Sequence, residues 1–219
     1  LEVNRGELFS LLGVNGAGKT TTIKMLSCLT KPTKGDAFLK GKSIIRDSAQ
    51  IKNFISVSPQ ETAIADGLTV LENLQFICGV YGFSKEKQKN KIQELVRLLK
   101  LEEDLKKKEG KLSGGFKRRL SIALALICEP EILFLDEPTL GLDVIARSEL
   151  WDLILSLKGK VTIILTTHYM EEAEALSDRV AIMKSGKLLI CDTPKKIKEK
   201  WEADSLEKAF ISIIKEASI

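Results

Sequence analysis

Apolar residues along this chain follow two patterns: short unbroken runs and positions repeated at helical spacing. The unbroken runs are rich in branched side chains, which is typical of strands buried on both faces of a parallel sheet. They are Glu7–Leu12, Phe54–Val57, Ile132–Leu135 and Val161–Thr167. Two further runs, Arg179–Met183 and Lys187–Cys191, are joined through Ser185-Gly186 and predict a hairpin. A sheet of this kind, with helices between its strands, indicates the α/β class.

Between Leu68 and Pro130 the strand-like runs disappear and helical spacing replaces them. Residues 91–101 have an apolar stripe with lysines on the opposite face. We therefore expect the first part of an α/β core over residues 1–66, a helical subdomain over 67–130, and the second part of the core over 131–219. The predicted sheet is mostly parallel with flanking helices, and the segment after Asp192 is predicted to form amphipathic helices.

Composition and charge narrow the possible functions. A net charge of +4 and an aromatic content of 5 % give little support to a nucleic-acid-binding surface. The four cysteines lie far apart and His168 is the only histidine, which disfavours a zinc site, a redox pair and a disulfide framework. No apolar run approaches the ~20 residues of a membrane-spanning helix. Lysine-rich stretches at 85–91 and 106–111 are interpreted as a solvated face, with contact to anionic lipid head groups as the alternative.

The stretch Gly13–Thr20 fits G-x-x-x-x-G-K-[ST], the pattern of a phosphate-binding loop. It follows a predicted strand and precedes a predicted helix, the context that this motif requires. Glycines allow successive backbone N–H groups to point at phosphate oxygens, and the helix adds its positive N-terminal end. Lys19 is expected to reach the β- and γ-phosphates, and the Thr20 hydroxyl to ligate Mg²⁺. The predicted nucleotide-binding residues are Asn15, Gly16, Ala17, Gly18, Lys19, Thr20 and Thr21.

Two carboxylates, Asp136 and Glu137, follow the predicted strand at Ile132–Leu135. Acids at the end of a buried strand are costly unless they serve an ion or a reaction. We expect Asp136 to ligate Mg²⁺ and Glu137 to polarise an attacking water, with capping of the next helix as the alternative. His168 ends another buried strand, and we expect it to contact the γ-phosphate.

Two further positions are less specific by themselves. Gln60 lies just past a predicted strand, where α/β proteins hold ligand groups, although an exposed loop glutamine is the default. Ser113-Gly114-Gly115 leads into a Leu- and Ala-rich helix whose free N–H groups offer a second anion site. A plain helix cap by Ser113 is the alternative, and without context it is favoured.

Together these motifs resemble those of the ATP-binding cassette ATPases, the nucleotide-binding subunits of ABC transporters, over nearly the whole chain. They agree in type, order and spacing: a Walker A loop at Gly13–Thr20, a Q-loop glutamine at Gln60, a signature at Leu112–Phe116, Walker B at Ile132–Asp136, the catalytic glutamate at Glu137, a D-loop at Gly141–Asp143 and the switch histidine His168. The runs Thr166–Glu174 and Lys117–Ser121 are most similar to the ABC-2 branch, which includes drug-exporting ATPases.

The resemblance implies a P-loop NTPase core with a RecA-like sheet, ATP and Mg²⁺ as cofactors, and hydrolysis of ATP coupled to export. It also implies a separate integral-membrane subunit and a head-to-tail dimer of identical or different ATPase subunits. Ser113, Gly114 and Gly115 would then contact the ATP held by the partner's Walker A loop. Gln60 would contact Mg²⁺ and the attacking water, and would couple the site to the membrane subunit. The chain would lie at the cytoplasmic face of the cell membrane, with no nucleic acid as partner.

Two features depart from the family's pattern. The signature usually ends in glutamine, whereas this chain has Phe116; the Ser-Gly-Gly core is intact, so activity is expected to survive. The family stacks adenine on an aromatic residue, and none precedes Phe9. We expect that residue and the leading antiparallel strands to lie before Leu1. Without it, ATP affinity would be weaker by roughly 5- to 150-fold, from a stacking contribution of ~1–3 kcal/mol.

Two other functions were weighed against the transporter. A soluble ABC-type ATPase acting on ribosomes or DNA-repair machinery is the alternative, but such proteins usually have two cassettes or long coiled coils. This chain has one cassette and no sustained heptads. A small GTPase is disfavoured because the nearest match to its guanine-reading motif, Asn90–Gln93, lacks the aspartate.

Overall fold

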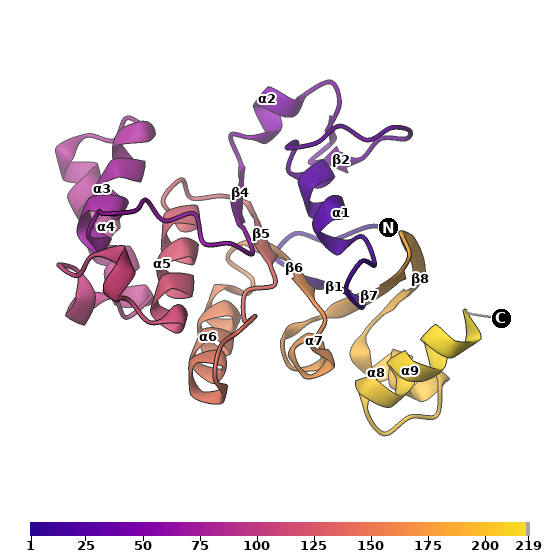
Figure 1. Ribbon diagram of the computed structural model, residues 1–219. Coiled ribbons are helices and arrows are strands. Elements are labelled where there is room, and N and C mark those ends of the chain that lie inside the picture. The colour runs from indigo at the N-terminus through magenta and orange to yellow at the C-terminus, as the bar shows by residue number, and fades with distance from the viewer. Residues whose placement is uncertain (218–219) are drawn as a thin grey trace.

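A mostly parallel six-stranded sheet lies at the centre of the computed structural model, which describes residues 1–217 (Figure 1). Its strand order is β4-β5-β6-β1-β7-β8. The strands are β1 (Leu8–Leu12), β4 (Ile55–Ser58), β5 (Ile132–Asp136), β6 (Thr162–Thr167), β7 (Arg179–Lys184) and β8 (Lys187–Asp192). Only the β7–β8 pair is antiparallel among these neighbours, as the hairpin through Ser185-Gly186 requires. The predicted α/β class is confirmed. Residues 218 and 219, the last two of the predicted third segment (131–219), lie outside the described residues.

Strand β1 occupies the interior of the sheet, between β6 and β7. All five of its residues are buried, because both faces of a parallel sheet are covered. Its register with β6 runs from Leu8 opposite Ile163 to Leu12 opposite Thr167. The carboxyl ends of β1, β5 and β6 therefore meet at one edge of the sheet.

Helices cover both faces of the sheet, and alternate side chains of each strand supply the two cores. Leu133 and Leu135 of β5 pack on the face covered by α5 and α6, whereas Phe134 packs on the opposite face, with α1. A third cluster joins β7 to α7, α8 and α9. These helices are α1 (Lys19–Leu26), α2 (Ser48–Ile51), α5 (Gly114–Leu126), α6 (Val144–Leu157), α7 (Met170–Leu176), α8 (Pro194–Lys200) and α9 (Leu206–Glu216). A small hairpin, β2 (Phe38–Leu39) with β3 (Lys42–Ser43), lies beside α1 (Figure 1).

The segment between β4 and β5 is helical, with α3 (Val70–Val80) and α4 (Lys85–Leu98) preceding α5. A capping box starts α3: the Glu72 N–H donates to Thr69 Oγ1 at 3.2 Å, and the Thr69 N–H donates to Glu72 Oε2 at 2.7 Å. Buried residues of α3 and α4 belong to the same hydrophobic cluster as the leucines of β5. The helical segment therefore shares its core with one face of the sheet.

The lysine-rich stretches of this segment are exposed, with one exception. Lys91 is only 8 % exposed, and its ammonium pairs with Glu94 at 3.0 Å and with Glu129 at 3.1 Å. The interpretation as a solvated face is therefore wrong at Lys91, because its side chain crosses from α4 to the end of α5. Within residues 1–217, no helix is long and apolar enough to cross a membrane. The four cysteines are free thiols.

Phe134 provides a test of the packing that supports the site. Its side chain is fully buried in β5, between Val57 of β4 and Ile164 of β6. Phe134→Ala should lower the free energy of unfolding by about 3–5 kcal/mol, because a cavity remains in the core. Urea unfolding of the nucleotide-free chain measures this loss. Phe76→Ala, at a side chain that is 56 % exposed, is the matched control and should change stability by less than about 0.5 kcal/mol. Similar losses of unfolding free energy in the two variants would contradict the assignment of Phe134 to the hydrophobic core.

Candidate functional site

A pocket of about 390 Å³ lies at the edge of the sheet where β1, β5 and β6 end. It is lined by residues 15–21, Gln60, Glu137, Leu140 and His168. The structure thus brings together the P-loop and three sequence-predicted residues from distant parts of the chain. Ligands of α/β proteins bind at this edge, outside the carboxyl ends of the strands.

The P-loop connects β1 to α1 and depends on glycine at two positions. A Cβ at Gly13 would lie 2.6 Å from the Met183 carbonyl oxygen and 2.8 Å from Ala17 Cβ. Gly18 has a φ of +101°, which side chains rarely allow, and it precedes α1 without a side-chain cap. The first N–H groups of α1 are therefore not capped by a side chain and suit an anion.

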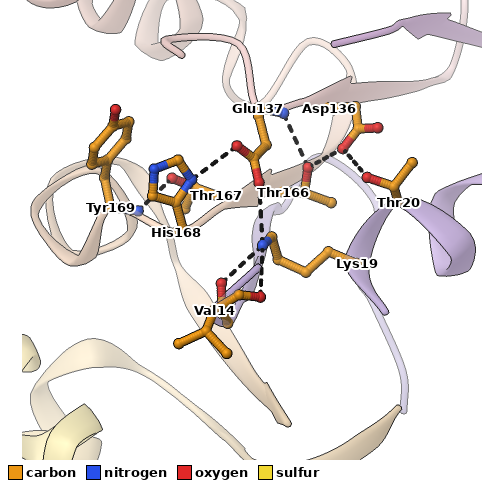
Figure 2. A network of polar contacts seen from close by, with 10 residues as sticks. Val14, Lys19, Thr20, Asp136, Glu137, Thr166, Thr167, His168 and Tyr169 are labelled. Carbon is orange, nitrogen blue, oxygen red and sulfur yellow. Dashed lines mark hydrogen bonds and ion pairs between the residues drawn. The ribbon is translucent and has the colours of Figure 1, made fainter. Parts of the chain in front are cut away.

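Lys19 is buried at the centre of a polar network (Figure 2). Its ammonium donates to the Gly13 carbonyl at 2.8 Å and the Val14 carbonyl at 3.3 Å, and it pairs with Glu137 Oε1 at 3.2 Å. An ammonium has three donors, so all of them are used within the chain. Lys19 is predicted to serve phosphate and Glu137 to serve water, and in the structure the two side chains bind each other.

Glu137 has an unusual backbone conformation, with a φ of +46°. For a non-glycine residue such a conformation costs about 1–3 kcal/mol, and six other non-glycine residues of the described chain also have a positive φ. Its N–H donates to the Thr166 carbonyl at 3.1 Å and the Thr166 hydroxyl at 3.0 Å, which hold the turn after β5. The second carboxylate oxygen contacts His168 Nδ1 at 2.8 Å (Figure 2).

Asp136 lies beside Thr20, as expected for two ligands of one metal ion. The Thr20 hydroxyl donates to Asp136 Oδ1 at 3.1 Å, and the Thr166 hydroxyl donates to the same oxygen at 2.5 Å. These oxygen donors suit Mg²⁺, which keeps several waters and takes further ligands from substrate phosphates. In residues 1–217 no group of three His, Cys, Asp or Glu side chains is arranged to hold a metal ion.

Thr166 was not identified from the sequence. It lies opposite Asp136 in the β5–β6 register, so its hydroxyl reaches both the Asp136 carboxylate and the Glu137 N–H. The available signal was a pair of polar residues, Thr166 and Thr167, after the apolar run Ile163–Leu165. Only the strand order shows which acid Thr166 contacts.

The signature residues lie elsewhere. Ser113 and Gly114 are exposed at the start of α5, and among the described residues they do not line the pocket. Strands β4 and β5 separate α5 from α1 (Figure 1). The Ser113 hydroxyl accepts the Phe116 N–H at 3.2 Å, which is the helix cap considered from the sequence. The Phe116 side chain is buried, so it does not extend over this surface.

A buried acid, Glu172, lies on α7 close behind His168. It is fully buried, and the Trp151 indole N–H donates to its Oε1 at 3.1 Å. Burial raises the pKa of Glu172 above its ordinary value, and the hydrogen bond from Trp151 opposes the shift only in part. Through Trp151 this acid connects the histidine-bearing segment to α6. Sequence reasoning missed Glu172 because it lies within a run of ordinary helical residues.

The fold and site define a P-loop nucleotide-binding protein: a strand–loop–helix phosphate site, an acidic pair after one neighbouring strand and a histidine after the next. Comparison with known families agrees with this class. The family model described as ABC transporter matches residues 1–140. The chain belongs to the ABC transporter family, as an ATP-binding subunit of the ABC ATPase class, and the family predicted from the motifs is confirmed.

Two relatives illustrate the similarity. The chain is 42 % identical over 203 residues to the human phospholipid-transporting ATPase ABCA3, covering 93 % of this chain and 12 % of that protein. It is 39 % identical over 200 residues to the doxorubicin resistance ATP-binding protein DrrA of Mycobacterium tuberculosis (strain ATCC 25618 / H37Rv), covering 91 % and 60 % respectively. The chain therefore spans less than two thirds of each of these relatives.

Two solved structures are similar over most of the chain. One is an ATP-binding subunit of an ABC transporter, with a TM-score of 0.85 and 29 % identity over 98 % of this chain and 90 % of that one. The other is a dimeric ATP-binding cassette in a post-hydrolysis state with ADP and Pi bound, with a TM-score of 0.78 and 27 % identity over 88 % of each chain. The ABC ATPase fold is confirmed.

The buried acid predicts a measurable pH dependence of stability. An acid whose pKa is raised by folding binds its proton more tightly in the folded chain, so the free energy of unfolding falls as pH rises above about 4.5. Glu172→Gln keeps an acceptor for Trp151 and has no proton to lose. The stability of this variant relative to wild type should increase with pH, by up to about 1.4 kcal/mol per unit.

Urea unfolding between pH 4.5 and 7.5 measures this difference. Glu171→Gln changes the exposed neighbour on the same helix and is the matched control, with the pH dependence of wild type. A constant difference between Glu172→Gln and wild type across this range would show that Glu172 does not titrate abnormally.

Proposed function

We propose that this chain hydrolyses ATP as the ATPase subunit of an ABC exporter and drives transport through a separate membrane subunit. The observation that carries the proposal is the convergence of Lys19, Glu137 and His168 on one pocket at the end of the P-loop. The three side chains have complementary chemistry for a triphosphate: a cation, an acid able to accept a proton, and an imidazole. Each residue role below is part of this proposal.

The first step is an exchange of partners at Lys19. Its bond to Glu137 uses the same donor that a phosphate oxygen would need. On ATP binding, Lys19 would exchange the carboxylate for phosphate oxygens, and the charge of the ammonium would stay satisfied. The exchange would release Glu137 Oε1 from its pairing with Lys19. The Asn15–Thr21 segment, with N–H groups at the start of α1, would enclose the phosphates.

The released Glu137 then serves as the general base. Its strained backbone and its two bonds to Thr166 hold the carboxylate in the pocket. In this role it would polarise the water that attacks the γ-phosphate and accept its proton. His168, which contacts Glu137 Oε2, would donate to the γ-phosphate.

Mg²⁺ would be held by the oxygens of Thr20 and Asp136, which already lie 3.1 Å apart. When bound, the ion neutralises charge on the transferring phosphoryl group. Gln60 lines the same pocket from the loop after β4 and would complete the contacts to the ion and the attacking water. Thr166 keeps Asp136 oriented by donating to Oδ1.

A second ATPase subunit, identical to this chain or a different one, would complete the site. Ser113, Gly114 and Gly115 do not line the pocket of their own chain, and α5 lies across β4 and β5 from α1 (Figure 1), so their proposed contact with ATP would require a head-to-tail dimer. Val144 and Ile145, at the start of α6 beside the D-loop, are 77 % and 73 % exposed and supply apolar surface for such a contact. One structural relative is described as dimeric, which supports the proposal of a dimer.

The proposed organisation follows from these parts. Residues 1–66 and 131–219 form the nucleotide-binding core, and 67–130 form a helical subdomain that contacts the membrane subunit at the cytoplasmic face of the cell membrane. Export as the direction of transport is supported by the similarity to DrrA, whose name records doxorubicin resistance. ATP binding would close the dimer and hydrolysis would open it.

Glu137→Gln tests the catalytic assignment. The amide cannot accept a proton, so steady-state ATP hydrolysis should fall by at least about a hundredfold, while ATP binding remains and a dimer accumulates. Phosphate release measures turnover, and gel filtration with and without ATP measures the dimer. Glu131→Gln, at an exposed acid just before β5, is the control and should keep the wild-type rate. Normal turnover in Glu137→Gln would refute the role of Glu137.

Mixing two inactive variants tests the shared site. Lys19→Ala removes the phosphate lysine, and Ser113→Arg blocks the signature; each alone should be inactive. In an equal mixture half of the dimers are mixed, and each mixed dimer has one intact site, so activity should recover to at most about a quarter of wild type. No recovery, with mixed dimers present by cross-linking, would argue against a site built from two chains.

A further inference from the structure

Arg118 connects the signature helix to the loop that carries Gln60. It lies on α5, three residues after Gly115, and is only 5 % exposed. Its Nη1 donates to the Pro59 carbonyl and its Nη2 donates to the Gln60 carbonyl, both at 2.7 Å. The two bonds are charge-assisted and short, and the planar guanidinium makes both at once. Arg118 therefore binds the backbone of Gln60 rather than its side chain.

A second contact joins the same two elements one turn further along α5. The hydroxyls of Ser121 and Ser58 lie 2.9 Å apart, and both side chains are buried. Ser58 is the last residue of β4, immediately before Pro59 and Gln60. The loop after β4 is thus held to the side of α5 at two neighbouring points, while the N-terminus of the same helix presents the signature.

The charge of Arg118 makes this contact energetically selective. Burial lowers the pKa of its guanidinium, and the carboxylates of Asp136 and Glu172 raise it. A buried cation is costly, so the contact is favourable only while both carbonyls remain in place. Moving the Gln60 loop away from α5 would leave this charge without its hydrogen bonds. The loop and the helix are therefore expected to move as one unit.

We propose that Arg118 is a positioning residue for ATP hydrolysis: it fixes the backbone of Gln60 to the signature-bearing helix, so the position of α5 decides whether Gln60 points into the nucleotide pocket. The proposal rests on the role of Gln60 in the proposed function. It adds a specific connection between two parts of one chain. The Gln60 loop would contact the nucleotide of its own chain, and the signature would contact the nucleotide held by the second subunit. The alternative is that Arg118 only stabilises the fold.

Arg118→Lys tests the connection in the full chain. Lysine keeps the charge but cannot bond two adjacent carbonyls with a planar fork. Hydrogen–deuterium exchange of the amides of residues 60–62 should become at least about fivefold faster, with exchange in β4 unchanged. Arg119→Lys is the matched control: Arg119 is the next residue, pairs with Glu149 on the surface at 3.2 Å, and should leave this exchange at the wild-type rate. Unchanged exchange in Arg118→Lys would overturn the proposal.

Kinetics separate a positioning role from a structural one. In folded Arg118→Lys, kcat should fall roughly 10- to 100-fold while KM for ATP changes little, because the P-loop that binds the phosphates is not contacted by Arg118. In a double-mutant cycle with Gln60→Ala, the second substitution should add no further loss of kcat. If the losses of kcat in the two single variants multiply in the double variant, Arg118 does not act through Gln60. This result would overturn the positioning role of Arg118 and leave the proposed ATPase function standing.

The remaining outcomes are also decisive. Absence of ATP hydrolysis by the wild-type chain would refute the proposed function, and the exchange measurement would then decide whether Arg118 holds the loop. A wild-type rate in Gln60→Ala would refute the role of Gln60, and the positioning role of Arg118 would fail with it. If Arg118→Lys does not fold, Arg118→Gln replaces it, because the shorter neutral side chain cannot supply both charge-assisted bonds: faster exchange of residues 60–62 supports the connection, and unchanged exchange overturns it.

Discussion

The pairing of β1 between β6 and β7 is the interaction on which the rest of the site depends. Because β5, β6 and β1 are parallel neighbours, their carboxyl ends meet at one edge. The P-loop, Glu137 and His168 follow these three ends directly. A register shift of one residue would move each buried side chain to the opposite face of the sheet. The two hydrophobic layers therefore maintain the register, and the register brings together the residues proposed to be catalytic.

The site places opposite charges where water is largely excluded. Asp136, Glu137 and Lys19 are each less than 10 % exposed, and an isolated buried charge would cost several kcal/mol. Lys19 balances Glu137, while the hydroxyls of Thr20 and Thr166 donate to Asp136. A bound triphosphate would supply negative charge to Lys19, and its metal ion would supply positive charge to the carboxylates. In the proposed mechanism, nucleotide and metal ion would therefore replace these contacts with others of the same charge.

The fold also separates two functions of one helix. The start of α5 is exposed and presents Ser113 away from the P-loop of its own chain, whereas the middle of α5 is buried and bonds to the loop of Gln60. A helix is stiff over this length, so displacement at one end is carried to the other. This geometry offers a physical route by which contact with a second subunit could affect the first.

The sequence alone determined the elements and the local motifs, because these depend on short-range patterns. Buried runs identified the strands, Gly13–Thr20 identified the phosphate loop, and the acids after an apolar run identified Asp136 and Glu137. Only the tertiary structure decided which groups meet. The Lys19–Glu137 pair, the bonds of Thr166 and the contact of Arg118 with the Gln60 carbonyl join residues 29 to 118 positions apart. Such contacts follow from strand order and helix packing, and no local pattern of residue types encodes them.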